Sequence, residues 1–217
     1  MTSYVFTSES VSEGHPDKVC DQISDSIVDM FLAREPEARV AVETLATTNQ
    51  VVLAGEVRGD VTHEEMIASA REVIKKIGYE QEGFHWQHAN IDCYVHGQSS
   101  DIAQGVDEGE GDFTEEGAGD QGIMFGYACR ETPSLMPAPI QYAHQIMLKL
   151  AELRHAGESR LGPDAKSQVT LAYDNGQPVA TTNVVVSTQH AANATKAQVR
   201  DIVRGVVTDV LPQGWMP

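Results

Sequence analysis

Two glutamates, Glu43 and Glu56, are the clearest candidates for chemistry in this sequence. They lie in two β-like runs, residues 39–48 and 51–58, which we interpret as a hairpin with a two-residue loop at Asn49-Gln50. Such a loop would pair residue 43 with residue 56 and place two carboxylates opposite each other. Like charges there destabilise a sheet, so either a cation binds between them or the sheet edge is solvated. The mostly apolar runs favour a functional pair.

A second group of candidates stands at the start of a predicted helix, in the run Gly14-His15-Pro16-Asp17-Lys18. The backbone N–H groups of a helix N-terminus attract anions, His15 could donate a hydrogen bond to a phosphate, and Asp17 could bind Mg²⁺. The alternative is an ordinary helix start, in which Asp17 only complements the helix dipole. The residues alone leave both interpretations open.

A third group, Asp164-Ala165-Lys166, lies at the mouth of a second predicted hairpin. A lysine there could contact a phosphate as a point charge, although a lone surface lysine is the alternative. His85 and His88 lack further ligands at suitable spacing, so the sequence does not predict a zinc site.

Residues 117–122 match the GxGxxG pattern, but an acidic loop precedes them and no helix follows, which excludes a Rossmann interpretation. The run instead predicts a tight turn that positions Asp120. Residues 98–116 are polar and rich in glycine, which is typical of an active-site gating loop and equally of a plain linker.

The elements that position these groups repeat along the chain. The pattern predicts strand, helix, hairpin and helix twice, with helices over 16–34 and from Thr62 to Gly78. A further strand near Ile91 completes the first copy. Residues 122–128 are predicted to form the strand that begins the second copy. We therefore expect an α+β fold of two βαββαβ-type domains, residues 1–97 and 117–217, with helices on one face of each sheet. The second copy is predicted to be truncated, because no final strand follows its last helix.

The composition excludes several classes of partner. The chain has 217 residues, with 15 basic against 32 acidic side chains and a net charge of −17, which argues against nucleic acid and anionic membranes. Three separate cysteines without a CxxC pair, and the lack of an export signal, predict a cytoplasmic location. Between Gly97 and Cys129 there is no lysine or arginine, so an anion bound there would need metal ions or a second chain.

Several runs resemble the methionine adenosyltransferase (S-adenosylmethionine synthetase) family. Residues 6–18, FTSESVSEGHPDK, resemble its N-terminal signature, and residues 117–128 resemble its adenine-side motif. Further matches follow in family order along nearly the whole chain: Leu135-Met136-Pro137, residues 163–169 and Ser187-Thr188-Gln189-His190.

This resemblance implies an enzyme of one-carbon metabolism that forms S-adenosylmethionine from ATP and L-methionine, with release of phosphate and diphosphate. The family pattern gives His15, Asp164, Ala165 and Lys166 to ATP, with His15 and Lys166 catalytic. It gives Glu56, Gln98 and Asp120 to methionine, Asp17 to Mg²⁺ and Glu43 to K⁺.

The resemblance also implies a homodimer or homotetramer with the active site between subunits. Ser100 and Asn49 depart from the family pattern, with proline and glycine usual at these positions. Motifs of the family's third domain do not occur in the chain, so we expect the chain alone to be weakly active or inactive. Two other hypotheses are a non-catalytic dimerisation partner or decoy of a full-length homologue, and an acidic cation-binding module.

Overall fold

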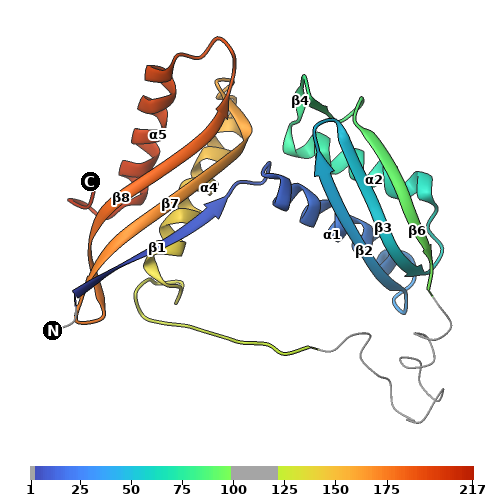
Figure 1. The fold of residues 1–217 in the computed structure, drawn as a ribbon, viewed down its shortest axis with the longest axis horizontal. Helices are drawn as coiled ribbons and strands as arrows, with labels where there is room; N and C mark the ends of the chain where they lie inside the picture. Colours follow the sequence, from blue (N-terminus) through green and yellow to red (C-terminus); the bar gives the residue numbers. More distant parts are fainter. Residues whose placement is uncertain (1–2, 99–121) are drawn as a thin grey trace. The chain divides into compact units, whose positions relative to one another are not determined.

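A computed structural model describes residues 3–98 and 122–217. The chain forms two compact units, which we call unit 1 (residues 1–18 and 126–217) and unit 2 (residues 19–125). Each combines a three-stranded sheet with helices (Figure 1), which confirms the predicted mixed fold of two domains. The domain limits 1–97 and 117–217 remain a prediction.

Unit 2 contains a three-stranded sheet in the order β2-β3-β6. Strands β2 and β3 form the predicted antiparallel hairpin, and β6 lies parallel to β3 on its other side. A two-stranded ribbon, β4-β5, follows the second helix. The bounds are α1 (Pro16–Arg34), β2 (Arg39–Thr47), β3 (Gln50–Arg58), α2 (His63–Ile77), β4 (Glu80–Gln81), β5 (Phe84–His85) and β6 (Asn90–Gly97).

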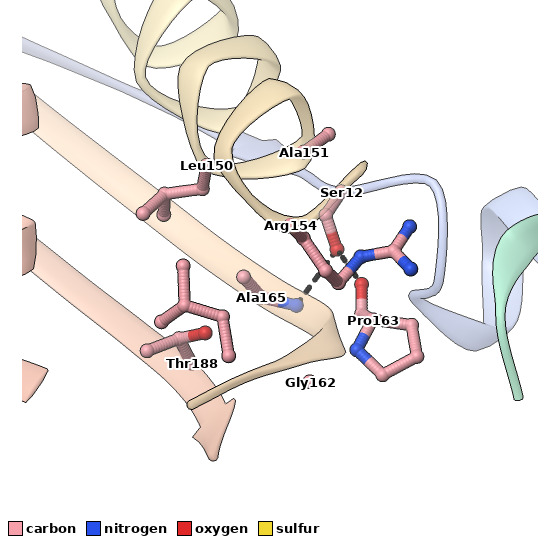
Figure 2. A pocket seen from close by; sticks show the side chains of 9 residues that line it. Ser12, Leu150, Ala151, Arg154, Gly162, Pro163, Ala165 and Thr188 are labelled. Carbon is pink, nitrogen blue, oxygen red and sulfur yellow. Dashed lines mark hydrogen bonds between the residues drawn. The ribbon is translucent and has the colours of Figure 1, made fainter. Parts of the chain in front are cut away.

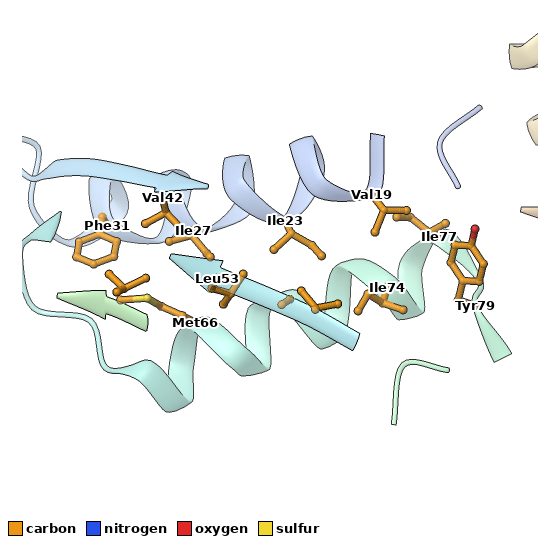
Figure 3. Packing of buried hydrophobic residues seen from close by; sticks show 13 residues of the cluster. Val19, Ile23, Ile27, Phe31, Val42, Leu53, Met66, Ile74, Ile77 and Tyr79 are labelled. Carbon is orange, nitrogen blue, oxygen red and sulfur yellow. The ribbon is translucent and has the colours of Figure 1, made fainter. Parts of the chain in front are cut away.

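Helices α1 and α2 bury their apolar stripes against one face of this sheet (Figure 3). Every fourth residue of α1 is fully buried, as the sequence predicted: Val19, Ile23, Ile27 and Phe31. Each such side chain contributes roughly 1.5–3 kcal/mol when removed from water. Helix α2 begins at the predicted capping box and ends at Gly78, whose φ of 94° is left-handed.

Unit 1 contains an antiparallel sheet in the order β1-β7-β8, with α4 and α5 packed on one face. Alternate residues of β7 are buried against these helices, and the residues between them form an open face. Asn175 and Gly176 both have positive φ in the β7–β8 turn, which the Asp174-Asn175-Gly176 motif predicted. The bounds are β1 (Ser3–Val11), α4 (Ala138–His155), β7 (Leu161–Asp174), β8 (Gln177–His190) and α5 (Lys196–Val210).

Two expectations about the strands were wrong. Strand β1 does not join the sheet of the hairpin that follows it, because it pairs with β7 from Ser3↔Asp174 to Val11↔Lys166. Residues 122–128 form no regular structure, and Met124 and Phe125 are almost fully exposed. An apolar run becomes a strand only where another strand satisfies its backbone groups.

In unit 2, β6 pairs with β3 on the side away from β2. Within the described ranges, no strand pairs with β8 on the side away from β7, so the second sheet has no counterpart of β6. None of the helices in those ranges is long and apolar enough to cross a membrane.

Candidate functional site

The hairpin of unit 2 places Glu43 and Glu56 differently from the sequence prediction. Glu43 pairs with Ala54, and Glu56 pairs with Ala41. The prediction was wrong because the turn residues are Thr48 and Asn49, between paired Thr47 and Gln50, and Asn49 takes the left-handed φ of 53°. This turn lies one residue earlier than expected, which changes every pair in the ladder. The carboxylates are therefore diagonal neighbours, a less repulsive arrangement than direct opposition.

The two glutamates still share the face of the sheet that α1 and α2 leave open. Glu43 is exposed and Glu56 half-buried, and Glu56 pairs with His96 across the parallel β3–β6 ladder. Gln98 extends this ladder, because its backbone N–H donates to the Val57 carbonyl at 2.9 Å. The structure thus places Glu43 and Glu56 on one sheet face, Glu43 in the middle of β2, with Gln98 just beyond the end of β6.

In unit 1, residues 12–15 connect β1 to α1 and are fastened to β7 by Ser12. The buried Ser12 hydroxyl donates to the Pro163 carbonyl and accepts from the Ala165 backbone N–H, both at 2.7 Å. The Ser12 backbone N–H donates to the Ala165 carbonyl at 2.9 Å. Figure 2 shows both hydroxyl contacts. A Cβ at Gly14 would lie 2.4 Å from the Pro163 oxygen, so this close approach requires glycine.

This connection brings His15 and Asp17 close to β7. The Asp17 backbone N–H donates to His15 Nδ1 at 3.3 Å, so a neutral ring carries its proton on Nε2 and can donate it to a ligand. The His15 side chain is 26% exposed and that of Asp17 is 82% exposed. Burial raises the pKa of Asp164, and the charge of His15 partly opposes this shift, which couples the two predicted segments electrostatically.

Lys166 lies on the open face of unit 1, at a groove of about 230 Å³. Its Nζ is 2.8 Å from Glu9 Oε2, and Gln168 Nε2 donates to the other Glu9 oxygen at 2.8 Å. These two hydrogen bonds hold the pKa of Glu9 below its ordinary value. Lys166 is 48% exposed, so its ammonium retains donors for an anion. Groove residues are Glu9, Lys166, Ser167, Gln168, Val185 and Ser187.

Ser10 and His144 support the end of β1 from the other face of the sheet. The Ser10 hydroxyl lies 2.7 Å from His144 Nδ1 on α4, and Ser10 is buried. Burial lowers the pKa of His144, and the charge of Lys18 lowers it further. The end of β1 is thus held by α4 on one face and carries Glu9 on the other.

The residues predicted to bind metals are single carboxylates. In the part of the chain that the structure describes, no group of three or more histidine, cysteine or acidic side chains could hold a metal ion. Asp17 nevertheless fits Mg²⁺, which commonly takes one or two protein carboxylates and completes its shell with phosphates and water. Glu43 offers one exposed carboxylate for K⁺, with Glu56 as its diagonal neighbour.

The predicted residues thus lie in two groups, one on each unit. In unit 1, hydrogen bonds of Ser12 join the loop that carries His15 to the segment 164–166, and Asp17 follows His15 at the start of α1. Asp120, and residues 99–116 of the predicted gating loop, lie outside the described residues. Sequence reasoning did not single out two residues that the site uses.

These two residues are Glu9, which pairs with Lys166, and Ser12, which clamps the loop. Both lie inside the FTSESVSEGHPDK run, so the motif itself was the signal.

Comparison with known proteins gives matches along almost the whole chain. Residues 3–100 match the family described as S-adenosylmethionine synthetase, N-terminal domain, and residues 115–216 match S-adenosylmethionine synthetase, central domain. The two matches occur in this order and describe parts of one family.

Three bacterial relatives illustrate the similarity. The chain is 62% identical over 222 residues to the S-adenosylmethionine synthase of Hyphomonas neptunium, and 60% identical over 219 residues to that of Parvibaculum lavamentivorans. It is 63% identical over 218 residues to S-adenosylmethionine synthase 2 of Rhodospirillum rubrum. Each alignment covers 100% of this chain but 56% of the relative, so the chain spans little more than half the length of these proteins.

Proposed function

The chain belongs to the S-adenosylmethionine synthetase family, and we propose that it carries part of a methionine adenosyltransferase site. In the proposed reaction, the sulfur of L-methionine attacks C5′ of ATP and forms the sulfonium of S-adenosylmethionine. The C5′–O bond breaks and triphosphate leaves. Water then cleaves triphosphate to diphosphate and phosphate. The supporting observation is the set of hydrogen bonds from Ser12 to Pro163 and Ala165, because they hold the 14–18 and 164–166 segments together.

We assign the triphosphate to unit 1. The Nε2–H of neutral His15 donates to a phosphate oxygen, and the Lys166 ammonium lies on the same strand as Asp164, next to the loop that carries His15. Charge-assisted hydrogen bonds of this kind contribute roughly 1.5–3 kcal/mol each. Glu9 orients Lys166 over the groove and leaves N–H donors of the lysine ammonium for a phosphate. In this role His15 and Lys166 stabilise the charge that develops on the departing triphosphate.

We assign Mg²⁺ to Asp17, because this carboxylate is exposed and could share a metal ion with phosphate oxygens. The metal ions would supply positive charge that this acidic chain lacks. Glu43 is the proposed K⁺ ligand.

We assign methionine to unit 2, where Glu56 and Gln98 offer an anionic acceptor and an amide near each other on the open face. Asp120 is the third proposed methionine residue. Carboxylates suit this reaction because a neutral thioether becomes a sulfonium cation, so negative groups nearby stabilise the transition state more than the ground state.

The proposal includes a cytoplasmic homodimer or homotetramer whose subunits share the site. A triphosphate brings further negative charge to a chain that already carries −17, so cations must come from metal ions and from other polypeptide. We therefore propose that the 217-residue chain alone turns over slowly or not at all.

Complementation tests this function. The chain is mixed with a full-length relative that is inactivated at the positions matching His15 and Lys166, and S-adenosylmethionine is measured by mass spectrometry. Production by the mixture, but not by either protein alone, supports the proposal. A His15→Asn chain is the matched control and should not rescue. Failure of the wild-type chain to rescue contradicts the proposal, and inhibition of an active relative would indicate a decoy.

A further inference from the structure

We propose that Arg154 is a positioning residue whose ion pair with Glu13 fixes the loop that presents His15 and Asp17 to the nucleotide. This inference rests on the proposed function, since it concerns how unit 1 holds its phosphate-binding loop. Arg154 belongs to none of the motifs identified in the sequence, and it stands at the end of α4 rather than in the groove of Lys166.

The contact joins α4 to the loop before α1. The Arg154 Nη2 group donates to Glu13 Oε1, and the same oxygen lies 2.7 Å from His155 Nε2. The Arg154 side chain is only 12% exposed and that of Glu13 is 29% exposed, in contrast to the exposed surface pairs of this protein. An ion pair with this degree of burial is less screened by water and salt than a surface pair.

The packing around Arg154 favours one conformation of its side chain. Arg154 reaches from α4 past Ser12 and Pro163 (Figure 2). With Leu150, Ala151 and Leu161 it lines a cavity of about 10 Å³, which is space for one water molecule at most. The arginine also belongs to the last turn of α4, where the helix dipole favours a cation. A preorganised guanidinium in this place can hold Glu13 without a large entropic cost.

The position of Glu13 explains why this pair matters for the site. Ser12 fastens the loop to β7, and Glu13, the next residue, fastens it to α4. Gly14 then passes close to Pro163. The backbone N–H of His15 donates to the Ser12 carbonyl at 3.1 Å and closes the turn. Anchors on two different elements prevent the loop from rotating about either one. Loss of the α4 anchor should therefore loosen His15 and Asp17 while the sheet and its core remain intact.

The experiment compares Arg154→Met, which keeps the apolar stem but removes the charge, with Arg160→Met. Arg160 is a matched control, because it pairs with Glu158 at 2.5 and 2.6 Å in the same unit and both partners of this pair lie outside the loop. Two quantities are measured: the amide exchange rates of Ser12 and His15, and the affinity for AMP-PNP with Mg²⁺ by calorimetry. Core amides of α4 report whether the unit stays folded.

We expect Arg154→Met to speed exchange at His15 at least tenfold and to weaken AMP-PNP binding at least fivefold, with the core amides and the Arg160→Met protein unchanged. Glu13→Gln should cause the same faster exchange and weaker binding. Arg154→Lys should retain part of the wild-type protection and affinity. The double variant, Glu13→Gln with Arg154→Met, should be no worse than either single variant. Unchanged exchange at His15, or faster exchange with unchanged affinity, overturns the inference. If the wild-type chain does not bind AMP-PNP, the proposed function fails, and the exchange rates alone decide whether the pair holds the loop.

Discussion

At the scale of single residues, unit 1 gathers groups from three separate segments around one short loop. Glu9 comes from β1, His15 and Asp17 from the β1–α1 loop and the first turn of α1, and Asp164 and Lys166 from β7. Lys166 is held by Glu9 yet remains 48% exposed. A lysine that was only part of an exposed ion pair would contribute little to the stability of the fold, because water and salt screen such pairs.

The role of Lys166 is tested by Lys166→Met. If Lys166 contacts phosphate, its removal should weaken binding of AMP-PNP with Mg²⁺ about tenfold or more, the equivalent of one charge-assisted hydrogen bond, and leave adenosine binding unchanged. Lys149→Met is the control, since Lys149 pairs with Glu152 at 2.7 Å on the surface of α4. Equal effects of the two substitutions in calorimetry would show that Lys166 has no specific contact.

The sequence predicted the residues of this cluster better than their partners. His15, Asp17 and Lys166 were visible because their types and neighbours suggest anion chemistry. The sequence did not indicate a role for Glu9, because its partner Lys166 lies on a strand far along the chain. Only the antiparallel β1–β7 register brings the two residues together. Residue type predicts what a side chain can bind, whereas its partners depend on tertiary structure.

At the scale of elements, local signals predicted helix ends and hairpins well and registers poorly. The capping box at Thr62 and Glu65 and the Asp174-Asn175-Gly176 turn were predicted correctly, since both depend on a few adjacent residues. The β2–β3 register depended on which residue takes positive φ. Both Thr48-Asn49 and Asn49-Gln50 are plausible turns, and a shift of one residue moved Glu56 opposite Ala41.

The capping box of α2 gives a prediction for pH. Arg34 and the Thr62 N–H hydrogen bond to Glu65 and lower its pKa from 4.5 to about 2. A folded-state pKa below the unfolded one means that this carboxylate stabilises the fold above about pH 4.5 and loses this effect as the pH falls towards 2. Glu65→Gln should therefore lower the melting temperature at pH 6 and have a smaller effect at pH 3.

Thermal unfolding followed by circular dichroism at both pH values measures this difference. Glu72→Gln on the same helix is the control, because Glu72 forms an exposed 3.5 Å pair with Lys75. A destabilisation by Glu65→Gln that is equal at pH 6 and pH 3 would contradict the assignment.

At the scale of the whole molecule, repetition along the chain correctly predicted two α+β domains but not how the strands are shared. The pattern placed β1 with the hairpin that follows it, whereas β1 pairs with β7 in unit 1. Periodicity records which face of a strand is buried and carries no information about which sheet the strand joins. The consequence for function is direct, because β1 leads into the loop that carries His15 and thereby brings it to β7.

Net charge is the other property of the whole molecule that constrains function. A chain of −17 repels a free triphosphate. The hydrogen-bond donors near the proposed triphosphate position, the Nε2–H of His15 and the ammonium of Lys166, stand beside Asp17, Asp164 and Glu9. Binding of a triphosphate at the proposed site therefore requires inorganic cations, and Asp17 is the described carboxylate that we assign to them.

Calorimetric titration of the chain with AMP-PNP, with and without Mg²⁺ at constant ionic strength, tests the proposal that Asp17 binds the phosphates through Mg²⁺. We predict measurable binding in Mg²⁺, at least tenfold weaker binding after its removal, and loss of most of this difference in Asp17→Asn, while adenosine binds alike in both conditions. Equally tight binding of AMP-PNP without Mg²⁺, or a magnesium dependence that Asp17→Asn leaves intact, would contradict it.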